Sequence, residues 1–421
     1  MTTDAQPPRE IGLPGAVLIN LNAVIGSGIF ALPALLYAGT GSMAPIVLLG
    51  FAVLVAAPML VVAKLSTLFD QSGGPELYAE RAFGPFAGFQ AGLFLLSQNL
   101  VARAANFHVL VAYLAAMFPL FDNPVVRLAT IAALIALFSG LAIVGTRRSI
   151  EALWVGTAFK LGPILLVCVA GFITNGLPTS VTLPEFSGVE SIALLMAYAY
   201  SGGALSTISA GEVRDPRRTV YRSILLNLAV IALLYAFVQW AYIAIDPQDA
   251  NPDRPLASAG EAVLGQWGVM AISVAAIFST GTNQLSFFVS MPRLLYGMAT
   301  RGLLPRALAR ISQRFRTPAN AIAAYGAIAA LLALSGSFET LATFMVALES
   351  LAVVLVVLAL PMLWRKGAVA LNAAWLGVVF VGLAFNVWLL LQVPLNSALP
   401  TLVIFTIGAG LYALGRRHDA A

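Results

Sequence analysis

The chain has 421 residues, of which 60% are hydrophobic and only 10% are charged, and its formal net charge is +5. Soluble domains carry about a quarter charged residues, so this composition excludes a soluble protein and predicts an all-α protein with many membrane spans. The single cysteine, Cys168, excludes a disulfide framework and a cysteine-based metal site. We expect no cofactor, no metal and no nucleic-acid partner.

Twelve apolar runs follow one another along the chain, each near the length of about 20 residues that crosses a bilayer. They lie at 12–37, 44–66, 87–118, 125–145, 151–175, 188–211, 221–245, 266–298, 319–335, 338–362, 371–392 and 396–415. Residues 1–11 are a polar tail without the basic region and cleavage site of a signal peptide, so the first run should be retained. We assign ten helices to a core at 12–362, and two helices and a second tail to 363–421.

Basic residues indicate the sidedness of these runs. Lysine and arginine gather in alternate connections, whereas the intervening connections carry only Arg127 and Arg254. Under the positive-inside rule, the basic connections and both termini face the cytoplasm. We therefore expect a multi-pass protein of the cytoplasmic (inner) membrane, surrounded by membrane lipids.

Glycines interrupt two of the runs. The first contains NAVIGSGIFALP at 22–33, with Gly26, Ser27 and Gly28 at its centre. Glycine in a helix interior costs about 1 kcal/mol relative to alanine, so we expect this helix to be broken. The sixth run, antiparallel and five spans later, has Gly202 and Gly203. This layout predicts an inverted repeat, spans one to five against six to ten, with discontinuous helices 1 and 6. The alternative is that these glycines only permit close helix packing.

A broken helix exposes backbone groups that can bind charge. Unpaired N–H groups at the start of a half-helix favour an anion such as a carboxylate. Bare carbonyls at the end of the preceding half-helix can accept hydrogen bonds from an ammonium group. A zwitterionic amino acid presents both charges on one carbon, so two facing breaks can bind its α-groups without a charged side chain.

Four motifs resemble those of the amino acid, polyamine and organocation (APC) superfamily of transporters, in the family's order along the chain. They are AVIGSGIFALP at 23–33, SGGPELYAERAFGP at 72–85, AGEVRDPRRTVYRSI at 210–224 and RLLYGMATRGLLPRAL at 293–308. The resemblance implies twelve helices, a core of five plus five inverted repeats, and alternating access around a central amino-acid site.

The resemblance also implies site residues. The backbone of Gly26, Ser27 and Gly28 would bind the substrate carboxylate. The amine would bind the carbonyls of residues in both breaks: Ala23, Val24, Ile25, Tyr200, Ser201 and Gly202. Many members carry a glutamate where this chain has Ala204, which argues against cationic substrates. A pocket lined by Tyr198, Tyr200, Ala204 and Leu205 would suit a neutral, fairly apolar side chain.

Lys160 lies within the fifth run, where a charged side chain is disfavoured by roughly 2.5–3.5 kcal/mol. Burial disfavours the charged ammonium form, so Lys160 could exchange a proton as the cavity opens to either side. Several APC members carry a lysine here in place of a sodium ion, and Thr282 and Ser286 would be its hydroxyl partners. The alternative is that Lys160 snorkels to the interface.

Four more polar residues are candidates for coupling or gating. Glu349, in the tenth run, either joins a proton relay or serves as a structural hydrogen-bond partner. Arg103, in the third run, would favour an acidic substrate if it pointed into the pocket; we expect instead an ion pair with Glu349 or a solvated vestibule. His108 is expected to be a hydrogen-bonded helix contact. Glu212 could form an inner gate with neighbouring arginines, or simply end its helix.

These features predict a secondary transporter of neutral, hydrophobic L-amino acids that uses proton-coupled alternating access. Enzyme motifs such as H-E-x-x-H, a P-loop and G-x-S-x-G do not occur in the sequence. A channel, an exporter or exchanger of acidic or cationic amino acids or polyamines, and a non-transporting amino-acid sensor remain as alternatives. We expect a monomer or homodimer, and the sequence does not indicate the direction of transport.

Overall fold

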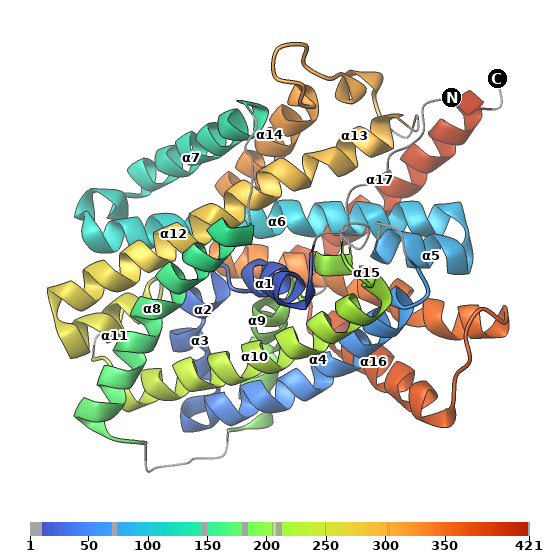
Figure 1. The fold of residues 1–421 in the computed structure, drawn as a ribbon. Coiled ribbons are helices and arrows are strands. Elements are labelled where there is room, and N and C mark those ends of the chain that lie inside the picture. The colour runs from blue at the N-terminus through green and yellow to red at the C-terminus, as the bar shows by residue number, and fades with distance from the viewer. Residues whose placement is uncertain are drawn as a thin grey trace.

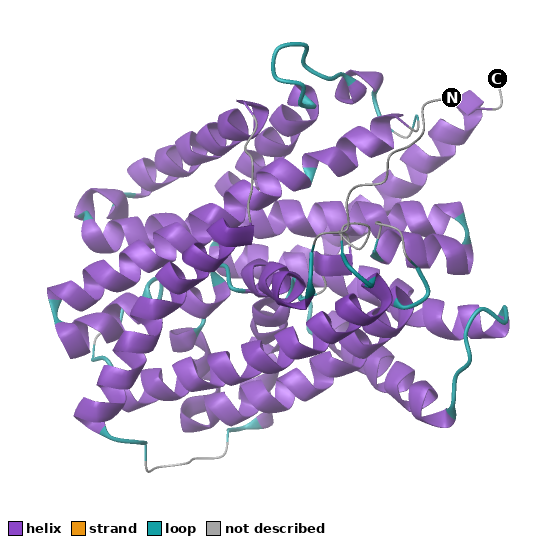
Figure 2. Cartoon of the chain, in the orientation of Figure 1, coloured by secondary structure: helices purple, strands orange, loops and turns teal. Residues whose placement is uncertain are grey.

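The computed structural model describes residues 11–69, 74–144, 150–178, 184–203, 205–207, 213–248, 250–300, 302 and 304–419 (Figure 1). Helices make up the regular structure of these ranges (Figure 2). The extended pairing within them is a single isolated bridge between Ile11 and Val213. The predicted all-α class is confirmed.

The long helices correspond closely to the apolar runs. They are α1 (Leu13–Val24), α2 (Gly28–Ala31), α3 (Pro33–Thr40), α4 (Ala44–Ser66), α5 (Pro75–Phe83), α6 (Pro85–Met117), α7 (Pro124–Val144), α8 (Ile150–Asn175), α9 (Phe186–Tyr200), α10 (Pro216–Ile245), α11 (Pro255–Leu264), α12 (Gln266–Ser290), α13 (Pro292–Thr300), α14 (Ala319–Ser335), α15 (Phe338–Arg365), α16 (Ala373–Leu391) and α17 (Leu395–Asp419). Short 3-10 turns are η1 (Gly41–Met43), η2 (Pro119–Asp122), η3 (Leu205–Thr207) and η5 (Arg306–Ala309).

Nine helical stretches among the described residues are long and apolar enough to cross a membrane, and α1, α9 and α14 are shorter apolar helices. Each of the twelve predicted runs therefore contains an apolar helix. The first and sixth runs contain short helices because both are interrupted: the first is divided into α1, α2 and α3, and α9 ends at Tyr200.

The break after α1 follows from its glycines. Ile25 leaves helical geometry with φ −74° and ψ 79°, and the amide of Gly26 donates to the carbonyl of Val24 at 2.8 Å instead of continuing the ladder. The amides of Phe30 and Ala31 then both donate to the carbonyl of Ser27 at 3.0 Å, which begins the next helix. The amides between these points precede the first bond of the new helix.

The break after α9 meets the break after α1 directly. Ser201 is extended, with ψ 149°, and Gly202 has φ +92°, a conformation that L side chains rarely adopt. A Cβ on Gly202 would lie 3.1 Å from the carbonyl oxygen of Ala23. Gly202 therefore both permits the turn and lets the two interrupted helices touch.

Helix packing places these breaks in the middle of the bundle. α1 packs against α8, α10 and η3 and is seen nearly end-on at the centre of Figure 1. α6 packs along α15, and α4 packs along α10. α6 is mostly buried, whereas the outer helices expose large apolar side chains such as Phe380 of α16 and Leu402 of α17. Such surfaces suit contact with lipid tails.

We predict that Gly188→Ala destabilises the protein. A Cβ at Gly188 of α9 would lie 2.2 Å from the carbonyl oxygen of Gly39 in α3, so the two helices would have to separate, at an overpacking cost of about 1–3 kcal/mol. The measurement is the thermal unfolding midpoint in detergent. Gly140→Ala is the matched control, because nothing lies within 4 Å of its Cβ position and helix propensity favours alanine. Equal midpoints for the two variants would show that the α3–α9 contact is loose.

Candidate functional site

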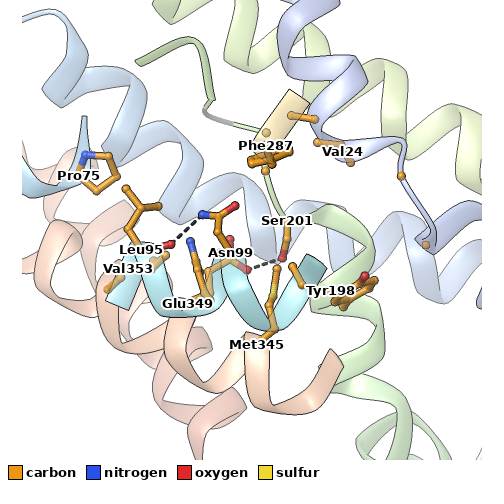
Figure 3. A pocket seen from close by; sticks show the side chains of 18 of the residues that line it. Val24, Pro75, Leu95, Asn99, Tyr198, Ser201, Phe287, Met345, Glu349 and Val353 are labelled. Carbon is orange, nitrogen blue, oxygen red and sulfur yellow. Dashed lines mark hydrogen bonds between the residues drawn. The ribbon is translucent and has the colours of Figure 1, made fainter. Parts of the chain in front are cut away.

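A central cavity of about 120 Å³ lies between α1, α4, α6, α9 and α15 (Figure 3). One water needs only about 10–15 Å³, so the cavity has room for a small molecule or several waters. Both helix breaks form part of its wall. The predicted substrate-site residues that line it are Ala23, Val24, Gly26, Ser27, Gly28, Tyr198, Ser201 and Gly202.

A polar cluster joins the two breaks to α6. The hydroxyls of Ser27 and Tyr198 both donate to Oδ1 of Asn106, the Tyr198 bond being 2.6 Å long, and the two hydroxyl oxygens lie 2.9 Å apart. All three side chains are buried and line the cavity. The sequence analysis noted Asn106 only as a neighbour of Arg103; its place one turn along the same helix face was the available signal.

Lys160 binds the break of α1 from the side away from the cavity. Its side chain is 2% exposed, and Nζ donates to the carbonyl oxygen of Ile25 at 3.1 Å. Ser279 Oγ of α12 donates to the same oxygen at 3.4 Å. Lys160 therefore does not snorkel: it satisfies a carbonyl that the break has freed.

The partners expected for Lys160 on α12 were wrong. Thr282 is exposed, and its hydroxyl donates to the carbonyls of Phe278 and Ser279 in its own helix. Ser286 lies two turns beyond Ser279 and is half-buried. Ser279 is the hydroxyl that shares the Ile25 oxygen, because the rotation of α12 turns this residue, rather than Thr282, towards α1.

Glu349 contacts the other break. It lies on α15, is partly exposed to the cavity, and accepts a hydrogen bond from the hydroxyl of Ser201, the residue that ends α9 (Figure 3). Ser201 Oγ also lies 3.1 Å from the carbonyl of Ala197. An acid on α15 therefore contacts the α9 break, as Lys160 on α8 contacts the α1 break.

Arg103 lines the cavity but does not pair with Glu349, so the expected ion pair is wrong. Its guanidinium donates to Oδ1 of Asn283 and stacks on the ring of Phe287, with Cζ 4.0 Å from the ring centroid. Both partners belong to α12, which packs against α6. Glu349 is held instead by Ser201 on the α9 side of the cavity.

Two predicted binding residues lie outside the cavity wall. Tyr200 turns to the other face of α9, where its hydroxyl donates to the carbonyl of Leu48 at 2.9 Å and its ring stacks on Phe51. Ile25 is buried, and its carbonyl is occupied by Lys160. His108 contacts the Ala333 carbonyl at 2.8 Å through Nε2. The remaining predicted residues, Ala204 and Glu212, lie outside the described part of the chain.

The cavity extends from the breaks towards one end of the bundle. Its wall continues along α6 to Leu95 and along α15 to Val356, and it reaches Pro75 at the start of α5. Beyond the breaks in the other direction, the Tyr113 hydroxyl donates to the Phe30 carbonyl at 2.7 Å, and the Tyr198 ring packs edge-on against Phe338. The site is thus asymmetric with respect to the two ends of the bundle.

Comparison with known proteins identifies the family. The profile of the amino acid permease family matches residues 11–412. This chain belongs to that family. The predicted membership of the APC superfamily is confirmed, and the protein is a multi-pass membrane transporter of amino acids rather than an enzyme.

Similar proteins include transporters of several kinds. An uncharacterised transporter of Mycobacterium tuberculosis is 29% identical over 77% of this chain and 73% of its own length. The serine/threonine exchanger SteT of Bacillus subtilis is 28% identical over 79% and 78%. Human cationic amino acid transporter 4 is 27% identical over 78% of this chain and 55% of its own length.

We predict that Tyr198→Phe raises the KM for the transported amino acid, whereas Tyr200→Phe leaves it within about twofold. The Tyr198 hydroxyl joins the breaks through Asn106, and loss of a buried hydrogen bond costs about 0.5–1.5 kcal/mol, which corresponds to roughly 2- to 13-fold. The Tyr200 hydroxyl lies outside the cavity on the Leu48 carbonyl. Uptake kinetics in proteoliposomes measure both variants. A larger change in KM for Tyr200→Phe would place the site on the wrong face of α9.

Proposed function

We propose that the protein is a secondary active transporter that moves neutral, hydrophobic L-amino acids across the cytoplasmic membrane by proton-coupled alternating access. The observation that carries the proposal is the pair of helix breaks facing one cavity, each bound by an ionisable side chain from another helix. Lys160 binds the Ile25 carbonyl at the first break, and Glu349 binds the Ser201 hydroxyl at the second.

The cavity wall supports a zwitterionic substrate with an apolar side chain. Gly26, Ser27 and Gly28 line it with backbone that precedes the first bond of the next helix, where amides favour a carboxylate. The rest of the wall is largely apolar. Its apolar members include Met59, Val62, Leu95, Phe287, Met345 and Val356. A pocket with a few polar groups at one place and apolar walls elsewhere fixes the orientation of such a ligand.

Lys160 supports proton coupling through its position. It lies behind the break rather than in the cavity wall, so it contacts the substrate only through the backbone at Ile25. A substrate that rearranges this backbone changes the hydrogen bond to Lys160 and with it the balance between ammonium and amine. By linkage, the protonation state of Lys160 then changes the affinity for the substrate by the same factor.

Sidedness and assembly complete the proposal. If the basic connections face the cytoplasm, the end of the bundle that holds α5 is cytoplasmic, and the cavity extends inward in this conformation. We assign the transport cycle to residues 12–362, with 363–421 outside the moving core and both termini in the cytoplasm. A monomer or homodimer satisfies this scheme, since the cavity lies within one chain.

We predict that Lys160→Met and Lys160→Ala abolish the dependence of transport on an imposed pH gradient. The affected quantity is the coupling between proton and substrate, which for linked sites is typically about 5- to 150-fold in affinity. Uptake of labelled leucine or methionine is measured in proteoliposomes with and without the gradient. Lys64→Met is the matched control, because Lys64 lies at the end of α4 over the Trp375 ring.

Counterflow in the same proteoliposomes separates the possible failures. A coupled or uncoupled carrier exchanges labelled substrate, a channel conducts without saturation, and a sensor binds without moving label. If wild-type protein moves no labelled amino acid, the transport proposal is overturned. If the Lys160 variants keep the full gradient dependence, proton coupling through Lys160 is overturned while transport stands.

We predict that Glu349→Gln retains counterflow but flattens the pH dependence of substrate binding. Glutamine preserves the shape and the hydrogen bond to Ser201 and removes the titrating carboxyl group. Ser201→Ala tests the hydrogen bond alone, and Glu339→Gln, at the exposed start of the same helix, is the matched control. A pH profile of binding that Glu349→Gln leaves unchanged would make Glu349 a structural partner only.

A further inference from the structure

Arg103 is a buried cation on the cavity wall that the proposed transport cycle does not use. Its side chain is 5% exposed and comes from the middle of α6, the helix that forms one side of the cavity. Placing a charge at such a depth is costly unless a partner compensates it. The partner is therefore the feature to identify.

The described residues supply no anionic partner for Arg103. The ion pairs found among them involve Arg127, Arg218 and Arg254, all outside the cavity. The contacts of Arg103 are the neutral amide of Asn283 and the ring of Phe287. Its Nε is buried and has no hydrogen-bond partner. One donor of the guanidinium fork is thus left unsatisfied at a cavity wall.

Arg103 lies beside the break in α1. Asn283, which accepts its hydrogen bond, also donates from Nδ2 to the carbonyl of Asn22 at 2.8 Å. The Oδ1 atom of Asn283 would lie 3.7 Å from a Cβ on Gly26. Asn106, one turn further along α6, bonds Ser27. A ligand seated at the break therefore lies within one side chain of the guanidinium.

We propose that Arg103 binds a carboxylate of the transported molecule. The inference rests on the proposed function, since it places this contact in the same cavity. A guanidinium presents parallel N–H donors that match a carboxylate, and such charge-assisted bonds are about twice as strong as neutral ones. The carboxylate has two possible sources: the α-carboxylate of any amino acid, or the side chain of an acidic one. In the second case the substrate class is acidic rather than neutral.

Binding to purified protein in detergent, measured by calorimetry, tests the proposal with matched ligand pairs. Leucine against leucinamide reports on the α-carboxylate. Aspartate against asparagine, and glutamate against glutamine, report on a side-chain carboxylate. The variants are Arg103→Gln, Arg103→Lys and Asn283→Asp. The last keeps the arginine but places a competing carboxylate at the atom that already accepts its hydrogen bond. Arg127→Gln is the matched control, because Arg127 pairs with Asp253 outside the cavity at 2.8 Å.

We expect Arg103→Gln to weaken the carboxylate-bearing ligand by roughly 10- to 100-fold and to leave its amide partner unchanged. Asn283→Asp should weaken the same ligand, Arg103→Lys should retain part of the affinity, and Arg127→Gln should bind as wild type. Loss for leucine but not leucinamide assigns the α-carboxylate, and loss confined to aspartate or glutamate assigns the side chain.

Two outcomes overturn the inference in distinguishable ways. If Arg103→Gln is folded by its thermal transition and binds every ligand within about twofold of wild type, Arg103 is structural and the proposed function stands. If wild-type protein binds none of the ligands, the proposed function fails and the role of Arg103 fails with it.

Discussion

The structure depends on how this chain satisfies backbone groups where a helix stops inside the membrane. In hydrocarbon, each unpaired amide or carbonyl costs several kcal/mol, so an interrupted helix persists only where neighbours supply partners or where a polar cavity forms. Lys160 and Ser279 supply donors to the Ile25 carbonyl, and Tyr235 reaches the Val24 carbonyl at 3.4 Å. The groups left on the other side face the cavity, so the cost of breaking the helix also creates the place where a ligand can bind.

The two breaks are supported in the same manner by side chains of different charge. Lys160 lies on α8, the fifth span, and Glu349 lies on α15, the tenth. Each contacts the interrupted helix at the start of its own half of the chain. An inverted repeat places such helices in corresponding positions, so the similarity follows from the architecture rather than from chance. A movement of either interrupted helix therefore changes the surroundings of an ionisable group, which is the physical requirement for coupling transport to protons.

Composition and glycine placement were sufficient to predict most of the fold, whereas side-chain direction was not. Gly202 could be recognised because a turn against another backbone requires its positive φ. Tyr198 and Tyr200 could not be separated, since two residues on a short helix look alike until the neighbouring helices are placed. The choice of Thr282 over Ser279 failed for the same reason: the rotation of α12 is set by packing. The neutral partner of Arg103, Asn283, lies 180 residues away along the chain, and no local pattern in the sequence indicates that contact.

A density map of the protein in lipid nanodiscs with a bound amino acid tests the central claim most directly. The account predicts that α1 and α9 are interrupted at Ser27 and Gly202, that the α-carboxylate and ammonium of the ligand lie against these breaks, and that its side chain extends along Met345 and Val356. Continuous helices through both positions, or a ligand bound away from them, would contradict it.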